Sequence, residues 1–146
     1  MARLWTDVEL AYLAGIIDGE GSFVLHRHKD GYRFASQLQV GNTDVRMLEW
    51  IAARFGGNVR LERRSNLKHK PIYRWVSDAS MLDALITATL PYLICKRDQA
   101  DLMLAYRRTL PPIIRTKRST NDVPEHVKTD RIRIHKSLAV LNRRGA

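Results

Sequence analysis

The sequence predicts a single α+β domain whose elements follow the order αββαββα, with additional helices after the last of these. Three observations predict this class. A capping box near the N-terminus starts a helix, two pairs of alternating apolar and polar segments indicate two antiparallel hairpins, and helical periodicity returns between and after them. The 146 residues suit one domain. We expect its core at about residues 5–109 and a basic helical extension at about residues 110–146.

The first helix begins at a capping box. Thr6 can accept a hydrogen bond from the backbone of Glu9, whose side chain can reach back to the backbone of Thr6. Gly19 and Gly21 indicate where this helix ends. Between these limits, apolar and small residues recur at the spacing of one helical face, at Leu10, Leu13, Ala14 and Ile17.

The first hairpin is predicted from alternation on either side of the turn Lys29-Asp30-Gly31. In residues 22–28, one face receives Phe23 and Leu25, and the other receives Val24, His26 and His28. The returning strand, residues 32–40, directs Phe34, Leu38 and Val40 toward the core. Its outward residues are Arg33, Ala35, Gln37 and Gln39.

A second helix and a second hairpin follow. Asn42 or Thr43 is the expected helix cap, and Gly56-Gly57 ends a helix with apolar residues at Val45, Leu48, Ile51, Ala52 and Phe55. Strands are predicted at 58–64 and 72–77, with Tyr73 and Trp75 facing inward. Helices are predicted near 79–89 and 97–109, then a break at Pro111-Pro112. A last helix near 123–143 carries an apolar stripe of Val127, Ile134, Leu138 and Leu141.

The charge of the chain is unusual for a soluble domain. The sequence has 25 Lys and Arg against 15 Asp and Glu, a formal charge of +10. Residues 107–146 hold 11 basic and three acidic residues, and residues 58–74 hold six basic residues and one acid, Glu62. Such an excess favours a polyanionic partner, nucleic acid or an anionic membrane, over the alternative of a generic soluble surface.

Cysteine content and hydropathy suggest the compartment. Cys95 is the single cysteine, which excludes an intrachain disulfide and suits a reducing compartment. No apolar run approaches the roughly 20 residues needed to span a bilayer. We therefore expect a soluble, intracellular protein with no membrane partner, cytoplasmic or within an organelle.

The segment 13–21, Leu-Ala-Gly-Ile-Ile-Asp-Gly-Glu-Gly, is physically odd. Gly15 lies inside a helix, where glycine costs about 1 kcal/mol relative to alanine. Gly15 and Gly19 share one face of small residues, which allows another helix to approach closely. Asp18 and Glu20 stand at a helix C-terminus, where the macrodipole disfavours anions, so a bound divalent cation is an expected compensation. The alternative for Asp-Gly-Glu-Gly alone is a polar turn.

The nine-residue string resembles the signature of the LAGLIDADG homing endonucleases, and the resemblance extends over about residues 7–108. Glu20 stands where the family name spells Asp. The further matching segments, in order, are Ser22-Phe23, Gln39-Val40-Gly41-Asn42, Arg46, Leu48, Phe55-Gly56-Gly57, Tyr73-Arg74-Trp75, Leu93-Ile94-Cys95-Lys96-Arg97 and Gln99-Ala100. The resemblance implies the αββαββα homing-endonuclease fold and an intron-encoded enzyme of the single-motif, homodimeric type.

The resemblance also implies roles for individual residues. Glu20, with the carbonyl of Gly19, would bind Mg²⁺, and Lys96 would stabilise charge at the scissile phosphate. Asn42 and Arg46 would organise solvent and phosphate. The alternatives are a solvated lysine for Lys96, a helix cap for Asn42 and a surface ion pair for Arg46. The signature helix would pair with its copy in a homodimer through Leu13, Ala14, Gly15, Asp18 and Gly19.

An antiparallel sheet of this kind would bind double-stranded DNA through its outward residues. The expected DNA-binding residues are Val24, His26, His28, Arg33, Gln37, Gln39, Asn58, Arg60, Glu62, Arg64, Lys68, Lys70 and Arg74. The extension, with Arg115, Lys117, Arg118, Arg131 and Arg133, would flank the DNA backbone.

The expected activity is metal-dependent cleavage of both strands of a long, partly palindromic target, which promotes mobility of the host intron. Three alternatives stay open at this point. They are an RNA-binding intron maturase on the same fold, a non-catalytic DNA-binding regulator on the same fold, and an unrelated ribosomal or RNA-binding protein.

Overall fold

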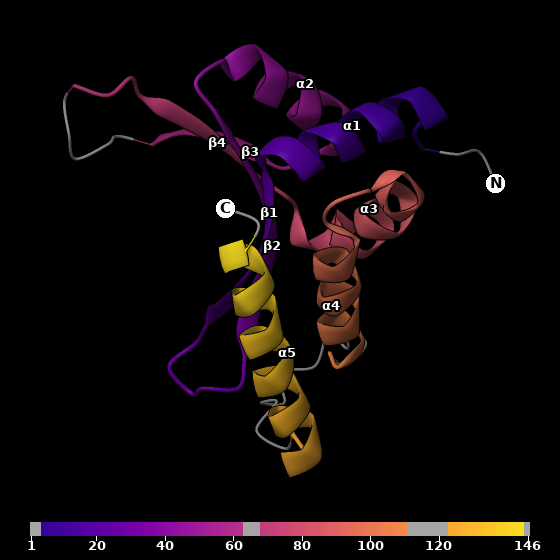
Figure 1. Ribbon diagram of the computed structural model, residues 1–146, viewed down its shortest axis with the longest axis vertical. Coiled ribbons are helices and arrows are strands. Elements are labelled where there is room, and N and C mark those ends of the chain that lie inside the picture. The colour runs from indigo at the N-terminus through magenta and orange to yellow at the C-terminus, as the bar shows by residue number, and fades with distance from the viewer. Residues whose placement is uncertain (1–3, 63–67, 111–122, 145–146) are drawn as a thin grey trace.

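The computed structural model describes residues 4–62, 68–110 and 123–144. Figure 1 shows a four-stranded antiparallel sheet with helices packed against it. The α+β class and the order αββαββα with further helices are confirmed. The elements are α1 (Asp7–Glu20), β1 (Gly21–Arg27), β2 (Phe34–Asn42), α2 (Val45–Phe55), β3 (Asn58–Glu62), β4 (Ile72–Val76), α3 (Leu82–Thr89), α4 (Arg97–Arg108) and α5 (Glu125–Arg144). Among these residues, no helix is long and apolar enough to cross a membrane.

The helix α1 starts at the predicted capping box. The Thr6 hydroxyl accepts a hydrogen bond from the backbone N–H of Glu9 at 3.1 Å, and the Glu9 carboxylate accepts one from the backbone N–H of Thr6 at 3.2 Å. The helix continues through Gly19 to Glu20, one residue before the strand β1 begins. This short connection means that the position of β1 fixes where the end of α1 lies.

The sheet has the strand order β1-β2-β4-β3, and its register agrees with the alternation in the sequence. Gly21 pairs with Val40 and Arg27 with Phe34 across β1 and β2, so Phe23 and Leu38 are opposite each other on the buried face. In the second hairpin, Val59 pairs with Trp75. Trp75 is fully buried, whereas Tyr73 is half-buried.

Two glycines join α2 to β3, as the sequence predicts. Gly56 and Gly57 have φ values of 75° and 90°, which other residues rarely adopt. A Cβ on Gly57 would lie 2.4 Å from the carbonyl oxygen of Val76, so only glycine fits. The indole N–H of Trp75 donates to the carbonyl of Gly56 at 2.8 Å and ties this turn to β4.

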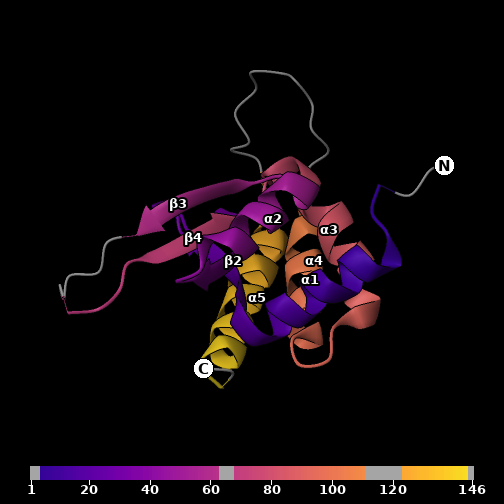
Figure 2. The same ribbon diagram turned by 90° about the horizontal axis from the view of Figure 1, so that it is seen from above.

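The remaining helices complete one hydrophobic core. Figure 2 shows α1, α3 and α4 together on one side of the sheet, while β3 and β4 extend away from them. Tyr106 of α4 anchors the start of β2, since its hydroxyl donates to the carbonyl of Phe34 at 2.8 Å and accepts from its N–H at 2.9 Å. The predicted stripe of α5 is partly confirmed, with Ile134 and Leu138 buried and Val127 and Leu141 half-buried.

Candidate active site and nucleic-acid interface

The carboxylate of Asp18 binds the chain segment that leads into α4. It accepts hydrogen bonds from the backbone N–H groups of Ile94 at 2.9 Å, Cys95 at 3.1 Å and Lys96 at 3.1 Å. These donors offset the unfavourable position of an anion at the end of α1. Compensation by a cation is therefore unnecessary for Asp18, because its own chain supplies the donors.

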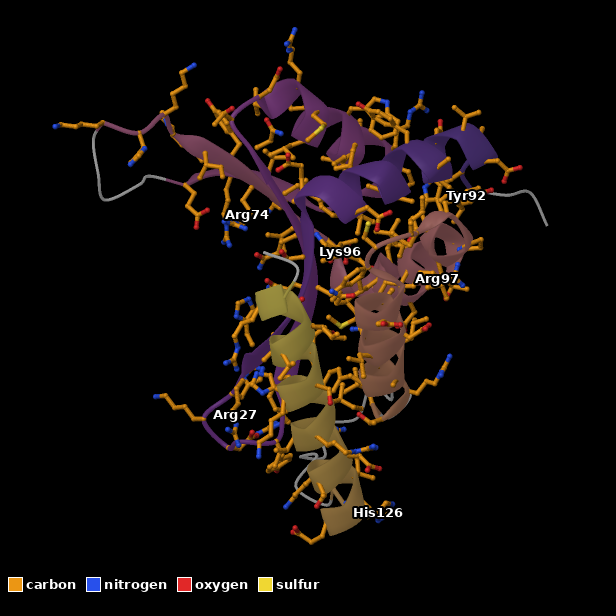
Figure 3. All side chains as sticks on the ribbon, viewed as in Figure 1. Arg27, Arg74, Tyr92, Lys96, Arg97 and His126 are labelled. Carbon is orange, nitrogen blue, oxygen red and sulfur yellow. The ribbon has the colours of Figure 1, made fainter. Side chains whose placement is uncertain are left out.

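Lys96 in turn contacts the end of α1 with its side chain. Its ammonium group donates to the carbonyl oxygens of Ile17, at 3.0 Å, and of Gly21. A cation at this position interacts favourably with the carbonyl oxygens at the C-terminal end of α1, and the carbonyl of Ile17 also accepts from the backbone N–H of Gly21. Figure 3 shows Lys96 below the end of α1. Lys96 is thus half-buried and bound to protein atoms, rather than being a fully solvated lysine.

In the sequence, Glu20 lies between Ile17 and Gly21, whose carbonyl groups bind Lys96, and its side chain is exposed to solvent. Within the part of the chain that the structure describes, its carboxylate makes no hydrogen bond or ion pair. A carboxylate that none of the described residues binds is available to a ligand. Asp18 and Glu20, two residues apart, therefore have different surroundings: the first is bound to backbone N–H groups and the second is open.

The donor atoms near Glu20 suit a hard divalent cation. They are the carboxylate oxygens of Glu20 and backbone carbonyl oxygens of the last helical turn, such as that of Gly19, and Mg²⁺ prefers oxygen ligands. In residues 4–62, 68–110 and 123–144, no three His, Cys, Asp or Glu side chains are grouped closely enough to hold a metal ion. A cation at Glu20 would need the remaining oxygens from water, a phosphate or a second chain.

Asn42 stands at the same end of the sheet as Glu20, because it lies two residues beyond the pair Gly21–Val40. The cap of α2 is Asp44, not Asn42 or Thr43, which corrects the sequence prediction. Asn42 forms a turn instead, its side-chain oxygen accepting from the backbone N–H of Asp44 at 2.8 Å. Asp44 directly precedes the first helical residue, Val45, and its carboxylate accepts from the backbone N–H of Arg46 at 3.0 Å.

Arg46 forms the surface ion pair that the sequence left as an alternative. Its Nη2 lies 2.6 Å from Oδ2 of Asp44, and its side chain is 85% exposed. Hydrogen bonds from the side chain and backbone of Arg46 lower the pKa of Asp44 to about 2. Arg46 is therefore held near Asn42 by an acid that the sequence analysis did not single out.

The outer face of the sheet carries a hydrogen-bonded network that crosses all four strands. The Glu62 carboxylate of β3 accepts from Arg74 Nε at 2.8 Å, and Arg74 Nη1 donates to Gln39 Oε1 at 3.2 Å. Gln39 Nε2 donates to Gln37 Oε1 at 2.6 Å and contacts His26 Nε2 at 3.4 Å. We call these five residues the outer-face network. It explains why Gln39, predicted to point outward, is only 9% exposed.

The other residues predicted to bind DNA have varied surroundings. Arg33 is bound to Asp30 inside the hairpin turn, which lowers the pKa of Asp30 to about 2. Val24 is half-buried in a cleft that α5 also lines. Arg64, Arg115, Lys117 and Arg118 lie outside the described residues. The exposed members of the predicted set are His26, His28, Arg33, Asn58, Arg60, Glu62, Lys68 and Lys70.

Arg131 of α5 is a structural residue, which corrects its expected role at the DNA backbone. It is 2% exposed, and its guanidinium donates to the hydroxyl and the carbonyl oxygen of Thr109, both at 2.9 Å. The same group lies 5.9 Å from the ring centre of Tyr106. Arg133, by contrast, is 73% exposed and pairs with Asp130 at 3.3 Å. Helical spacing alone places Arg131 on the inner face beside Ile134 and Leu138.

The helix α1 presents an exposed stripe that contains both signature glycines. Val8 is 79% and Tyr12 is 53% exposed, and a Cβ built on Gly15 or Gly19 would meet no atom within 4 Å. Leu13 and Ala14 are fully buried in the core of their own chain. Their side chains cannot contact a partner, so this part of the expected interface is corrected to the stripe Val8, Ala11, Tyr12, Gly15 and Gly19.

Comparison with known proteins identifies the fold. No family model matches the chain, and no curated protein matches its sequence. Solved structures do match: the arrangement of helices around this sheet is the fold of the LAGLIDADG homing endonucleases.

Three structures illustrate the similarity. The homing endonuclease I-CvuI, solved in complex with DNA, is 24% identical with a TM-score of 0.71, over 92% of this chain and 82% of its own. Archaeal, intron-encoded I-Vdi141I, also complexed with DNA, is 17% identical with a TM-score of 0.69, over 92% of this chain and 84% of its own. I-GzeII, in complex with a DNA target, is 20% identical with a TM-score of 0.65, over 88% of this chain but 44% of its own.

Proposed function

We propose that this chain is a LAGLIDADG homing endonuclease of the intron-encoded, homodimeric type. It binds a long, partly palindromic double-stranded DNA target and hydrolyses one phosphodiester bond in each strand in a reaction that needs a divalent cation such as Mg²⁺. Cleavage at one or very few genomic sites promotes mobility of the host intron.

The observation that carries this proposal is the arrangement at the end of α1, where Glu20 is exposed and Lys96 is bound. The Lys96 ammonium group donates to the carbonyl oxygens of Ile17 and of Gly21, the residue after Glu20, and β1 joins this point directly to the outer face of the sheet. Phosphodiester hydrolysis requires an oxygen ligand for a cation and positive charge near the phosphate. Both requirements are met beside Gly21, the first residue of the strand that would lie on DNA, because Glu20 precedes it in the chain and Lys96 binds its carbonyl oxygen.

Supporting observations come from the similar structures. I-CvuI and I-Vdi141I were solved in complex with DNA, and the I-CvuI complexes were obtained in the presence of Mg or Ca. These complexes favour a DNA target over the RNA-binding alternative. The formal charge of +10 supplies the electrostatic attraction that either nucleic acid would need.

The number of metal-binding acids that the reaction needs favours a homodimer. Each chain offers one Glu20, whereas two strands must be cut. Two copies joined through the exposed stripe of α1 would bring both Glu20 residues together under the DNA. The missing side chains of Gly15 and Gly19 would allow the two helices to approach closely.

Each residue then has a defined task. Glu20, with the carbonyl of Gly19, holds the cation, which when bound supplies positive charge to the transition state. Lys96, held at the end of α1 by its carbonyl partners, stabilises the developing charge on the scissile phosphate. Asn42 and Arg46 orient solvent and phosphate from the neighbouring end of β2. Asp18 keeps the segment of Lys96 against α1.

Cleavage of a randomised DNA library by the purified protein tests the proposal. With Mg²⁺ we expect double-strand cuts at one partly palindromic sequence, and none when the cation is removed by chelation. Absence of any site-specific cut in Mg²⁺, with a folded protein, would refute the proposed activity.

A further inference from the structure

We infer that Glu62 sets the base specificity of the sheet by positioning Arg74, without reading a base itself. Arg74, held by Glu62 and Gln39, would then recognise a guanine in each half of the target. This inference rests on the proposed function, and it deepens that function by assigning the outer-face network to one specific task.

The contacts of Arg74 leave a pair of donors unused. A guanidinium has five N–H donors. Glu62 Oε2 accepts from Nε at 2.8 Å and lies 2.7 Å from Nη2 in an ion pair, and Gln39 Oε1 accepts from Nη1 at 3.2 Å. One N–H therefore remains on each of Nη1 and Nη2. Guanine presents two acceptors, O6 and N7, side by side in the major groove, which matches two donors on one plane.

Arg60 provides the internal comparison. It lies directly opposite Arg74 in the β3–β4 register and is exposed. Among the described residues, Arg60 makes no hydrogen bond or ion pair, whereas Arg74 is held on three nitrogens and is 27% exposed. Like charges directly opposite repel, so Glu62 also keeps the two guanidinium groups apart. A fixed arginine can discriminate bases, and a loosely held one suits phosphate contacts.

Gln39 acts as the second support. Arginine only donates hydrogen bonds, so the contact with Arg74 assigns the side-chain oxygen of Gln39 to that side and its NH₂ group to Gln37 and His26. Both ends of Gln39 are thus engaged within the protein. We therefore assign Gln39 a supporting role in place of the direct DNA contact expected from the sequence.

The test is a specificity profile, in which every single-base variant of the preferred target is bound and cut by each protein. Arg74→Ala identifies the base pair that Arg74 reads. Glu62→Asp keeps the charge but is too short to hold Arg74 in place, and Glu62→Gln keeps the length without the charge. Glu49→Gln on α2 is the control for loss of one exposed carboxylate, and thermal unfolding confirms that each variant is folded.

We expect both Glu62 variants to lose discrimination at the same base pair as Arg74→Ala. A bidentate contact discriminates by about 5- to 150-fold, so a loss of about fivefold or more is expected there, with other positions unchanged. In the Arg74→Ala background, the Glu62 variants should have no further effect on the profile. Glu49→Gln should leave it unchanged.

Two results would overturn the inference while the proposed function stands. The Glu62 variants could change preference at a different base pair, which would mean that Glu62 reads a base itself. The Glu62 variants could also change the affinity for all DNA targets equally, which would mean that only the charge of Glu62 matters. If the unmodified protein has no preferred target, the proposed function fails and this inference fails with it.

Discussion

Asp18 and Lys96 hold each other across the gap between α1 and α4. Asp18 accepts the backbone N–H of Lys96 at 3.1 Å, and the Lys96 ammonium donates to the carbonyl oxygen of Ile17, the residue before Asp18, at 3.0 Å. One contact joins the side chain of Asp18 to the backbone of Lys96, and the other joins the side chain of Lys96 to the backbone beside Asp18. Movement of either segment would therefore break both hydrogen bonds. This arrangement fixes the end of α1, where Glu20 is exposed.

Replacement of Asp18 should uncouple the two segments. In Asp18→Asn, one neutral oxygen replaces a carboxylate that accepts from three backbone N–H groups. We expect the free energy of unfolding to fall by about 2 kcal/mol and cleavage to slow, because Lys96 loses its fixed position. Chemical unfolding and cleavage rates measure the two effects. Asp101→Asn, on the exposed side of α4, is the control, and equal behaviour of the two variants would contradict this role for Asp18.

A large side chain at Gly15 should prevent pairing without harming the chain's own fold. A Cβ at this position meets no atom within 4 Å, and glycine is a poor helix former, so Gly15→Leu should raise helix stability by about 0.5–1 kcal/mol. The same side chain blocks a close approach of two α1 helices. Sedimentation should show a dimer for the unmodified protein and a monomer for the variant. A variant that still forms the dimer would exclude this stripe as the interface.

The stability of the domain should depend on pH through His135. Burial and then the charge of Arg27 lower the pKa of His135 below its ordinary value of 6.5, and its ring stacks on Phe34 at 4.7 Å. Below pH 6.5 the unfolded chain binds a proton that the folded chain does not, so stability falls as the pH drops until the lowered pKa is reached. Asp30 and Asp44, with pKa values of about 2, change the stability in a separate pH range, below pH 3.8.

The variant His135→Phe keeps a ring on Phe34 and removes the titration. Thermal midpoints between about pH 5 and pH 8 should slope less for this variant than for the unmodified protein. Parallel curves for the two proteins would show that another group causes the dependence.

Two arginines of α5 should behave differently. Arg131→Ala removes a buried guanidinium and its bonds to Thr109, so we expect a loss of about 3 kcal/mol in the free energy of unfolding. Arg133→Ala, at an exposed surface pair, should change stability by less than about 0.5 kcal/mol. If Arg133 contacts a DNA phosphate, its loss should reduce the salt dependence of binding by about one unit of slope. The reverse order of stability losses would contradict the assignment of Arg131.

Local sequence patterns were sufficient for the elements of the fold. Three features depend only on residues close together in the chain and can therefore be recognised from the sequence. They are the capping box at Thr6, the alternation around Phe23 and Leu38, and the glycine pair after Phe55. The helix cap was the exception, because Asn42, Thr43 and Asp44 are all good caps and only the backbone geometry selects Asp44.

The site was less predictable because its contacts join distant segments. The motif identified Glu20, but the partners of Asp18 lie more than 70 positions away in the chain. The Glu62–Arg74 pair depends on a diagonal contact between strands, and the burial of Arg131 depends on how α5 packs on α4. Patterns within one element do not carry such tertiary information.

The most direct test of the proposed mechanism is the variant Glu20→Gln, compared with Glu49→Gln as a matched exposed carboxylate. The Glu20 side chain makes no hydrogen bond or ion pair within the described residues, so the variant should fold normally and bind its DNA target with unchanged affinity. We predict that it cuts neither strand in Mg²⁺, while Glu49→Gln cuts both at the normal rate. Normal cleavage by Glu20→Gln would contradict the assignment of Glu20 as the metal-binding acid.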